Sequence, residues 1–175
     1  MRLEPLEARH EEPLWEVAQD ERVWRWMRVR GDESRDAFHA WFEAMLAPGA
    51  FPFATIVDGV PLGHTSYLNV READRVVEIG NTWLATQAWG TGANTEAKLL
   101  LLQHAFEGEG FLRVEFKTEA ANARACAALA ALPAQFEGIF RKHMLVRGGE
   151  RRDSAWYSVI DDDWPAVKAA LRARF

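Results

Sequence analysis

The most informative part of this sequence is Trp83-Leu84-Ala85-Thr86-Gln87-Ala88-Trp89-Gly90-Thr91-Gly92-Ala93-Asn94-Thr95-Glu96-Ala97-Lys98. A strand-like segment leads through two glycines into a strongly helical run. The first N–H groups of a helix lack intrahelical partners and lie at the positive end of its dipole, and glycine lets an anion approach the backbone closely. The stretch therefore predicts an anion-binding loop at a helix start, although one Gly-x-Gly motif needs the support of its context.

Two better-known phosphate-binding loops fit this stretch less well. A P-loop has Lys-Ser or Lys-Thr directly after its last glycine, whereas Ala93-Asn94 follow Gly92. A dinucleotide fingerprint has a third glycine or alanine where this chain has Thr95, and an acidic residue about 20 residues further on. Glu115 stands at that distance, but its segment does not repeat the rest of the pattern. The P-loop is excluded, and the dinucleotide fingerprint stays an alternative.

Length and composition indicate a single domain that covers residues 1–175. A chain of 175 residues with 49% hydrophobic content is long enough for one well-packed core and short for two. No run of about 18 apolar residues is present, and the residues after Met1 lack the pattern of a signal peptide. We therefore expect a cytoplasmic protein that has no membrane partner.

Net charge and cysteine content limit the classes of partner and the kinds of metal site that we expect for this chain. The 21 basic and 26 acidic residues give a net charge of −5, which argues against a nucleic-acid partner and fits an amine-bearing one. The single cysteine, Cys126, excludes a disulfide within the chain and a thiolate metal site. No His-Glu-x-x-His motif occurs, and the run Asp161-Asp162-Asp163 is interpreted as a helix cap. We expect no metal.

Hydrophobic periodicity and turn signals predict an α/β (α+β) fold. Two helices, at 11–21 and 33–46, precede three strands that form an antiparallel meander, at 51–58, 63–70 and 75–84. A crossover unit follows, with a helix at about 93–107, a strand at 112–118 and a helix at 122–132. Two closing strands, at 136–146 and 153–160, lead to a last helix that starts at Asp163.

These features together resemble the GNAT superfamily of acyl-CoA-dependent N-acetyltransferases. The resemblance is carried by the order of elements, by Asn122, by the turn from Trp89 to Ala97, and by Val77-Glu78-Ile79-Gly80-Asn81-Thr82-Trp83-Leu84. Segments 137–141 and 153–159 are most similar to the branch that includes the ribosomal-protein N-terminal acetyltransferases. The resemblance implies a mixed, mostly antiparallel central sheet of about six or seven strands, with helices on both faces and a splayed central cleft.

The resemblance also implies acetyl-CoA as cofactor, with its pyrophosphate on the backbone of the glycine loop. The family pattern Arg/Gln-x-x-Gly-x-Gly/Ala fits in two registers, starting at Gln87 or at Trp89. We prefer the second, which agrees with the Thr95-Glu96-Ala97 that follows and leaves departures at Trp89 and Asn94. The implied cofactor-binding residues are Trp83, Leu84, Trp89, Gly90, Thr91, Gly92, Ala93, Asn94 and Asn122.

For catalysis, the resemblance implies direct attack of an amine on the thioester, with Glu78 as base and a backbone N–H near Trp83 or Leu84 as oxyanion donor. The alternative for Glu78 is a strand residue that faces solvent or pairs with an arginine. Many relatives supply the general acid from a tyrosine or serine, at positions that here hold Leu129 and Ala125. A thiol with a pKa near 8.5 can leave as a thiolate without that acid.

On the acceptor side, the resemblance places Trp24, Arg28 and Trp41 over the substrate groove. The helical spacing of the aromatic residues is equally consistent with core packing, and the arginine with a solvated surface.

The function that we predict from the sequence is acetyl-CoA-dependent N-acetylation of a primary amine. A protein N-terminal α-amine, such as that of a ribosomal protein, is placed ahead of a small-molecule amine. The non-enzyme alternative is an acyl-CoA-binding regulator, which the absence of the tyrosine and serine motivates. Edge strands and the final hairpin leave a homodimer open.

Overall fold

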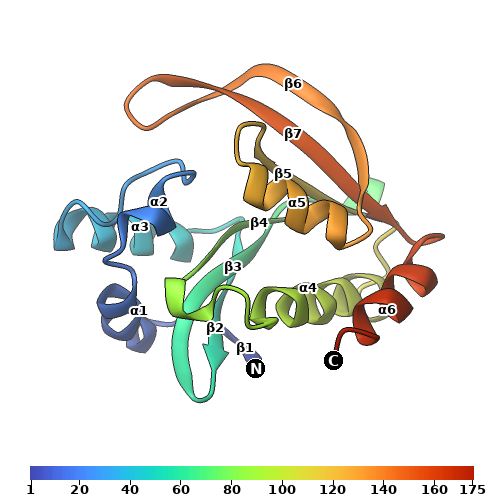
Figure 1. Cartoon of the computed structure of the whole chain (residues 1–175), viewed down its shortest axis with the longest axis horizontal. Coiled ribbons are helices and arrows are strands. Elements are labelled where there is room, and N and C mark those ends of the chain that lie inside the picture. Colours follow the sequence, from blue (N-terminus) through green and yellow to red (C-terminus); the bar gives the residue numbers. More distant parts are fainter. The chain divides into compact units, whose positions relative to one another are not determined.

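The computed structural model describes residues 1–175. Its seven strands are β1 (Arg2–Pro5), β2 (Phe51–Val57), β3 (Val60–Arg71), β4 (Val76–Leu84), β5 (Arg113–Glu119), β6 (Gln135–Val146) and β7 (Glu150–Ile160). Its six α-helices are α1 (Glu11–Val17), α2 (Glu21–Trp24), α3 (Arg35–Leu46), α4 (Ala93–Gln103), α5 (Ala123–Ala131) and α6 (Trp164–Arg172) (Figure 1).

The strands form one sheet in the order β1-β2-β3-β4-β5-β7-β6. The pairs β1–β2, β2–β3, β5–β7 and β6–β7 are antiparallel, and β4–β5 is parallel. The parallel pairing spans three residue pairs and ends where Glu78 faces Glu115, although β4 continues to Leu84. The predicted mixed, mostly antiparallel sheet is confirmed.

The chain divides into two compact units, which we describe separately. The first unit comprises Met1–Leu68 and Gly80–Ala97, and the second comprises Asn69–Ile79 and Lys98–Phe175. The strands β3 and β4 and the helix α4 contribute residues to both units. The expectation of one domain over residues 1–175 stays a prediction.

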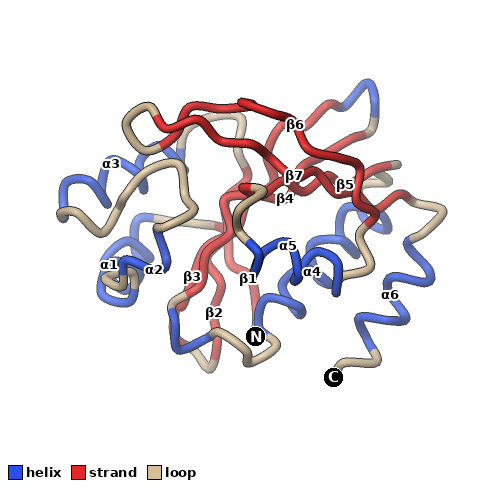
Figure 2. Tube along the Cα trace, turned by 45° about the horizontal axis from the view of Figure 1, so that its top comes forward, coloured by secondary structure: helices blue, strands red, loops and turns tan.

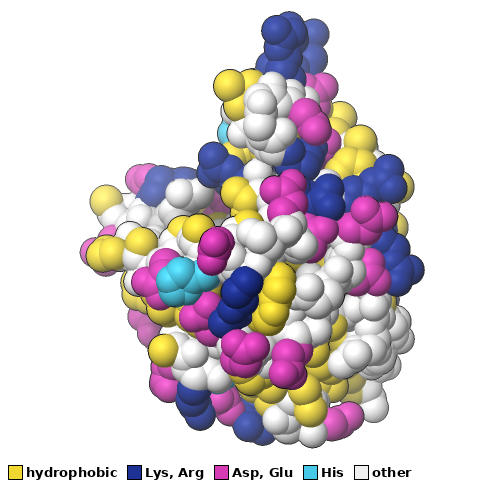
Figure 3. All heavy atoms as spheres, turned by 90° about the vertical axis from the view of Figure 1, so that its left-hand side faces the viewer, with side chains coloured by type: hydrophobic (Ala, Val, Ile, Leu, Met, Phe, Trp, Pro, Cys, Tyr) yellow, Lys and Arg dark blue, Asp and Glu magenta, His cyan; other side chains and the backbone are white.

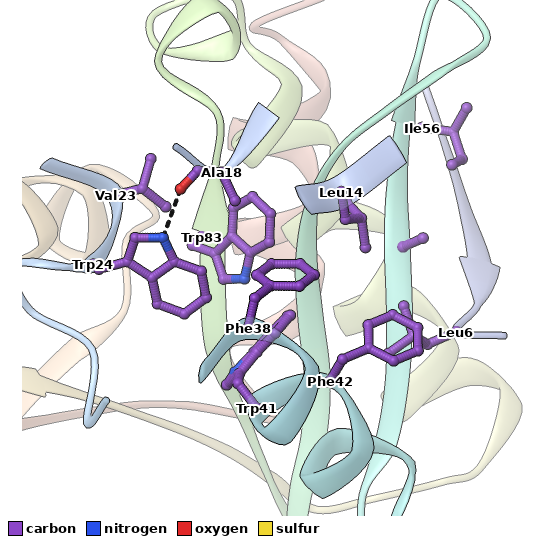
Figure 4. Close-up of a cluster of buried hydrophobic side chains, with 11 residues drawn as sticks. Leu6, Leu14, Ala18, Val23, Trp24, Phe38, Trp41, Phe42, Ile56 and Trp83 are labelled. Carbon is purple, nitrogen blue, oxygen red and sulfur yellow. Dashed lines mark hydrogen bonds between the residues drawn. The ribbon is translucent and has the colours of Figure 1, made fainter. Parts of the chain in front are cut away.

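The core of the first unit is a cluster of aromatic side chains. Helix α3 starts at Ser34, whose hydroxyl accepts a hydrogen bond from the Ala37 N–H at 3.0 Å. The i, i+3, i+4 spacing of its apolar residues then buries Phe38, Trp41 and Phe42 on one face. Figure 4 shows Phe38 and Trp41 turned toward Trp24 and Trp83. The ring centroids of Trp24 and Trp41 are 5.3 Å apart.

The second unit is built on β5, β7 and β6. Helix α5 packs on β5 and helix α6 packs on β7. Strands β6 and β7 form a long hairpin, visible as two neighbouring red tracks in Figure 2. The strand β5 is buried in its middle, where Val114 and Phe116 are among the least exposed residues of the chain.

The elements differ from the predicted ones in several places. The segment expected as one helix at 11–21 is divided, because the Asp20 carboxylate accepts from the Arg22 N–H at 3.0 Å and starts α2. The short strand β1 was not predicted, and β7 begins three residues earlier than expected. Helix α4 ends at Gln103 and continues as a π-helix over His104–Gly108. Asp163 precedes α6, but its side chain makes no capping hydrogen bond.

Charged side chains of both signs lie on the surface (Figure 3). The face in Figure 3 carries acidic and basic side chains interspersed, in a chain with a net charge of −5. None of the helices has the length and apolar character needed to cross a membrane. No group of three or more His, Cys, Asp or Glu side chains is arranged to hold a metal ion.

Candidate active site

The predicted anion-binding loop lies in the first unit, between β4 and α4. Gly90 and Gly92 have φ angles of +77° and +87°, which glycine adopts without steric cost. The helix begins with the Glu96 N–H donating to the Gly92 carbonyl at 3.0 Å. Five N–H groups of this loop and first turn donate to no group of the protein, those of Gly90, Thr91, Gly92, Asn94 and Thr95. The loop therefore gathers unpaired donors at the positive end of a helix dipole.

Local hydrogen bonds hold this loop in place. The Thr91 hydroxyl donates to the Ala88 carbonyl at 2.8 Å and accepts from the Ala93 N–H at 3.4 Å. A Cβ built at Gly90 would meet no atom within 4 Å, so the backbone is open on that side. The loop is fixed by its own contacts and accessible where an anion would approach.

Trp89 stands where the family pattern has arginine or glutamine. Its indole N–H donates to the Leu84 carbonyl at 2.8 Å, and the Arg22 guanidinium lies 5.6 Å from its ring centroid. Trp89 therefore ties the loop to the end of β4 and makes a cation–π contact, rather than offering a charge to a phosphate. The predicted residues Leu84 and Trp89 are thus brought together.

The strand β4 is kinked just before Trp83 and Leu84. Asn81 has a φ angle of +48°, which is left-handed backbone, and its carbonyl accepts from Nδ1–H of the buried His64 at 2.8 Å. The Asn81 side chain donates to the Met45 sulfur at 3.4 Å. These contacts hold the kink and set the direction in which the strand enters the loop.

Glu78, the predicted base, is buried in the second unit with 2% of its side chain exposed. Its Oε2 accepts from Asn69 Nδ2 at 2.8 Å and from Lys117 Nζ at 2.6 Å, while its Oε1 accepts no hydrogen bond. The carboxylate neither faces solvent nor pairs with an arginine, because its cationic partner is a lysine. This arrangement fixes one oxygen and leaves the other as a proton acceptor.

Aromatic and basic side chains surround this ion pair. Lys117 Nζ lies 5.2 Å from the Trp156 ring centroid, and the His143 ring lies 5.6 Å from the same ring. His143 Nδ1 is 3.1 Å from the Ser154 hydroxyl. Burial, followed by the charges of Lys117 and Arg152, lowers the pKa of His143 below its usual value, so the ring is neutral at pH 7.

Asn122 begins α5 as predicted. Its Oδ1 caps the helix by accepting from the Ala125 N–H at 3.1 Å, and its Nδ2 donates to no group of the protein. The side chain is buried. Asn122 therefore keeps one amide hydrogen-bonding group that the cap does not use.

The structure places two of the three predicted acceptor-binding residues in the core. Trp24 is fully buried, and its indole N–H donates to the Ala18 carbonyl at 2.8 Å. Trp41 is 5% exposed and packs against Trp24 and Phe38. Both tryptophans therefore pack in the core, as in the alternative interpretation of their spacing. A helical spacing that fits a groove also fits the buried face of a helix. Arg28 is exposed.

Three polar residues near these positions were not predicted from the sequence. Asn69 and Lys117 bind Glu78. The sequence feature that could have indicated the Lys117–Glu78 pair is a lysine and a glutamate in two separate, otherwise apolar strands. Lys98 lies in an apolar run of α4 and is buried, and that burial lowers its pKa to about 7. The Phe116 ring lies 6.0 Å from its Nζ.

The comparison with known families identifies the class of protein. The family described as acetyltransferase (GNAT) domain matches residues 1–134. The chain therefore belongs to the GNAT acetyltransferases, and it is an acetyltransferase domain by family. Acetyl transfer to an amine is the reaction of this family. A search of curated proteins gives no match.

Solved structures agree with this assignment. A GCN5-related N-acetyltransferase from Brucella melitensis is 33% identical, with a TM-score of 0.92 over 98% of this chain and 80% of that one. A putative acetyltransferase from T. thermophilus is 37% identical, with a TM-score of 0.93 over 99% of this chain and 93% of that one. Mycobacterium smegmatis RimJ, solved with CoA-disulfide, is 22% identical and shares the fold, with a TM-score of 0.84 over 98% and 88% of the two chains.

Proposed function

We propose that the protein transfers the acetyl group of acetyl-CoA to a primary amine, and that the acceptor is the α-amine of a protein N-terminus, such as that of a ribosomal protein. The observation that carries the proposal is the loop at the start of α4. Two left-handed glycines, Gly90 and Gly92, precede a turn whose N–H groups are unpaired. Unpaired donors at a helix start suit the pyrophosphate of a CoA thioester.

The residues that would hold the CoA moiety fit its chemistry. The unpaired N–H groups of Gly90, Thr91, Gly92 and Asn94 would bind the pyrophosphate, and the open side of Gly90 admits it. The unused Nδ2 of Asn122 would donate to a pantetheine carbonyl. The CoA thioester supplies the activated acyl group when it is bound. The loop anchors at Thr91 and Trp89 keep these donors in place before binding.

Glu78 is the residue that we assign to proton removal. Asn69 and Lys117 hold Oε2, so Oε1 is oriented to accept a proton from an amine directly or through water. The two hydrogen bonds to Oε2 also keep the carboxylate in one orientation when the acceptor arrives. The free amine then attacks the thioester carbonyl carbon, and the thiolate leaves.

The protonation state of the acceptor favours an α-amine over a lysine. An α-amine with a pKa near 8 is about a tenth neutral at pH 7, whereas a lysine with a pKa near 10.4 is less than about a thousandth neutral. An external α-amine therefore needs less proton removal than an external lysine does, whereas a lysine fixed beside Glu78 has its proton acceptor already in place.

The test is an acceptor panel read by release of the CoA thiol. The panel contains a peptide with a free α-amine, an Nα-blocked peptide with one lysine, and spermidine. We expect the free α-amine to be preferred and Glu78→Gln to lower kcat by about a hundredfold or more. Glu115→Gln is the matched control, because Glu115 is also buried, accepts from Arg71 and Arg113, and faces Glu78 across β4 and β5.

Three results would contradict parts of this proposal. Preference for spermidine would favour a small-molecule acceptor. Equal loss in Glu78→Gln and Glu115→Gln would remove Glu78 as base. Binding of acetyl-CoA without turnover of any amine would favour the acyl-CoA-binding regulator.

A further inference from the structure

The carboxylate of Glu78 contacts an amine of the chain itself. A base can take a proton only from a group within hydrogen-bond reach. The chain has four lysines, and Lys117 is the one whose Nζ contacts Glu78, at 2.6 Å. If Glu78 deprotonates an amine, Lys117 is the amine of the chain that lies within its reach.

The surroundings of Lys117 are those of a binding site for an ammonium group. Its Nζ contacts the Glu78 carboxylate on one side and lies 5.2 Å from the Trp156 ring centroid on the other. A carboxylate together with an aromatic face is the chemistry that recognises an amine. The Phe140 ring packs against Trp156 at 5.0 Å and extends this aromatic surface. The side chain of Lys117 is 15% exposed, so part of it reaches the surface.

We propose that Lys117 is an internal acetyl acceptor, and that the enzyme acetylates it when no external amine is present. This inference rests on the proposed function, because it takes Glu78 as the base and acetyl-CoA as the acyl donor. The Lys117 ammonium gives a proton to Glu78 along the 2.6 Å hydrogen bond. The nitrogen lone pair forms a bond to the thioester carbonyl carbon, and the carbon–sulfur bond breaks with its electron pair on sulfur. The second ammonium proton leaves the nitrogen to water as the amide forms, and Glu78 returns its own proton through water to the thiolate, so the products are N-acetyl-lysine, CoA and one proton released to solvent.

Acetylation of Lys117 would change the surroundings of Glu78, the base of the reaction. The amide has no charge, so Glu78 would lose its cationic partner and keep only the hydrogen bond from Asn69. Glu78 takes up one proton at a time, so an external amine that gives its proton to Glu78 competes with Lys117. We therefore expect an excess of a good acceptor to suppress the internal reaction.

The test uses the four lysines as internal references. The whole protein is incubated with deuterium-labelled acetyl-CoA and no acceptor, and labelling at each lysine is followed by peptide mass mapping. Exposed Lys142 reports direct chemical acetylation by the thioester. We expect Lys117 to be labelled faster than Lys142, although it is the more buried of the two. Lys117→Arg should lose this signal and keep the label on Lys142.

Two variants separate enzymatic from chemical labelling. Glu78→Gln should slow labelling of Lys117 by about a hundredfold and leave Lys142 unchanged. Glu115→Gln should leave both unchanged, and the urea midpoint of each variant verifies that it is folded. Faster labelling of Lys142 than of Lys117, or a Lys117 rate that Glu78→Gln does not alter, would overturn the inference.

The outcome also distinguishes this inference from the proposed function. Turnover of an external amine by a protein whose Lys117 stays unlabelled would overturn the inference and leave the function standing. Failure to bind acetyl-CoA in a calorimeter, with no labelling above the chemical rate at any lysine, would overturn both.

Discussion

Substitution of Trp24 by phenylalanine tests how the aromatic core of the first unit is held. The indole N–H donates to the Ala18 carbonyl at 2.8 Å, and both residues are fully buried. Trp24→Phe leaves that carbonyl without a partner, at a cost of about 1–3 kcal/mol. The smaller ring also leaves a gap beside Trp41 and Gly31, which adds about 1 kcal/mol. The expected total loss is about 2–4 kcal/mol.

The assay is urea unfolding followed by tryptophan fluorescence and circular dichroism. Trp26→Phe is the matched control, because Trp26 is only partly buried and its recorded ring contact is with Arg25. That variant should stay within about 0.5 kcal/mol of the parent protein. A loss below about 1 kcal/mol in Trp24→Phe, or equal losses in the two variants, would refute the assignment of Trp24 to a hydrogen-bonded core.

Three further predictions concern the ion pair, the kink and the titrating histidine. Lys117→Met leaves buried Glu78 without its cation and should lower the unfolding free energy by about 3–5 kcal/mol, measured by urea unfolding. Adding Glu78→Gln should restore most of this loss in the double variant, and additive losses of the two single variants would contradict the pairing. Asn81→Val forces a β-branched residue to a φ angle of +48° and should lower the unfolding free energy by about 1–3 kcal/mol. Asn81→Gly should stay within about 1 kcal/mol of the parent protein, and equal losses in the two variants would show that the kink is not strained. The lowered pKa of His143 means that the folded chain binds this proton less readily than the unfolded chain, so its contribution to stability is full above about pH 6.5 and is lost as the pH falls. His143→Gln should therefore flatten the decline in unfolding free energy between about pH 7.5 and pH 5.5, and an unchanged slope would contradict the shift.

Local signals account for the features that could be predicted from the sequence. The glycine loop at Gly90 and Gly92 and the cap at Asn122 depend on backbone rules that act over a few residues. The burial of Phe38 and Phe42 follows from helical spacing within α3. Such features can be read from a short window of sequence because their causes lie within it.

The remaining features depend on contacts between distant segments. Lys117 lies 39 residues after Glu78, and their contact arises from strands whose parallel pairing no local pattern specifies. Trp24 and Trp41 share a spacing that fits either a core or a groove, and only the packing of α3 against its neighbours decides between them. The strand β1 spans four residues, too few for an alternating pattern to stand out.

The most direct test of the central claim is calorimetric titration of acetyl-CoA and CoA into the parent protein and two glycine variants. Gly90→Glu puts a negative charge into the loop that we assign to the pyrophosphate. Gly59→Glu is the control, because Gly59 also has a positive φ angle, +85°, and equally open surroundings for a Cβ, but lies in the turn between β2 and β3. We predict micromolar binding that Gly59→Glu keeps and Gly90→Glu weakens by about tenfold or more. Binding that is absent from the parent protein, or unchanged in Gly90→Glu, would contradict the account.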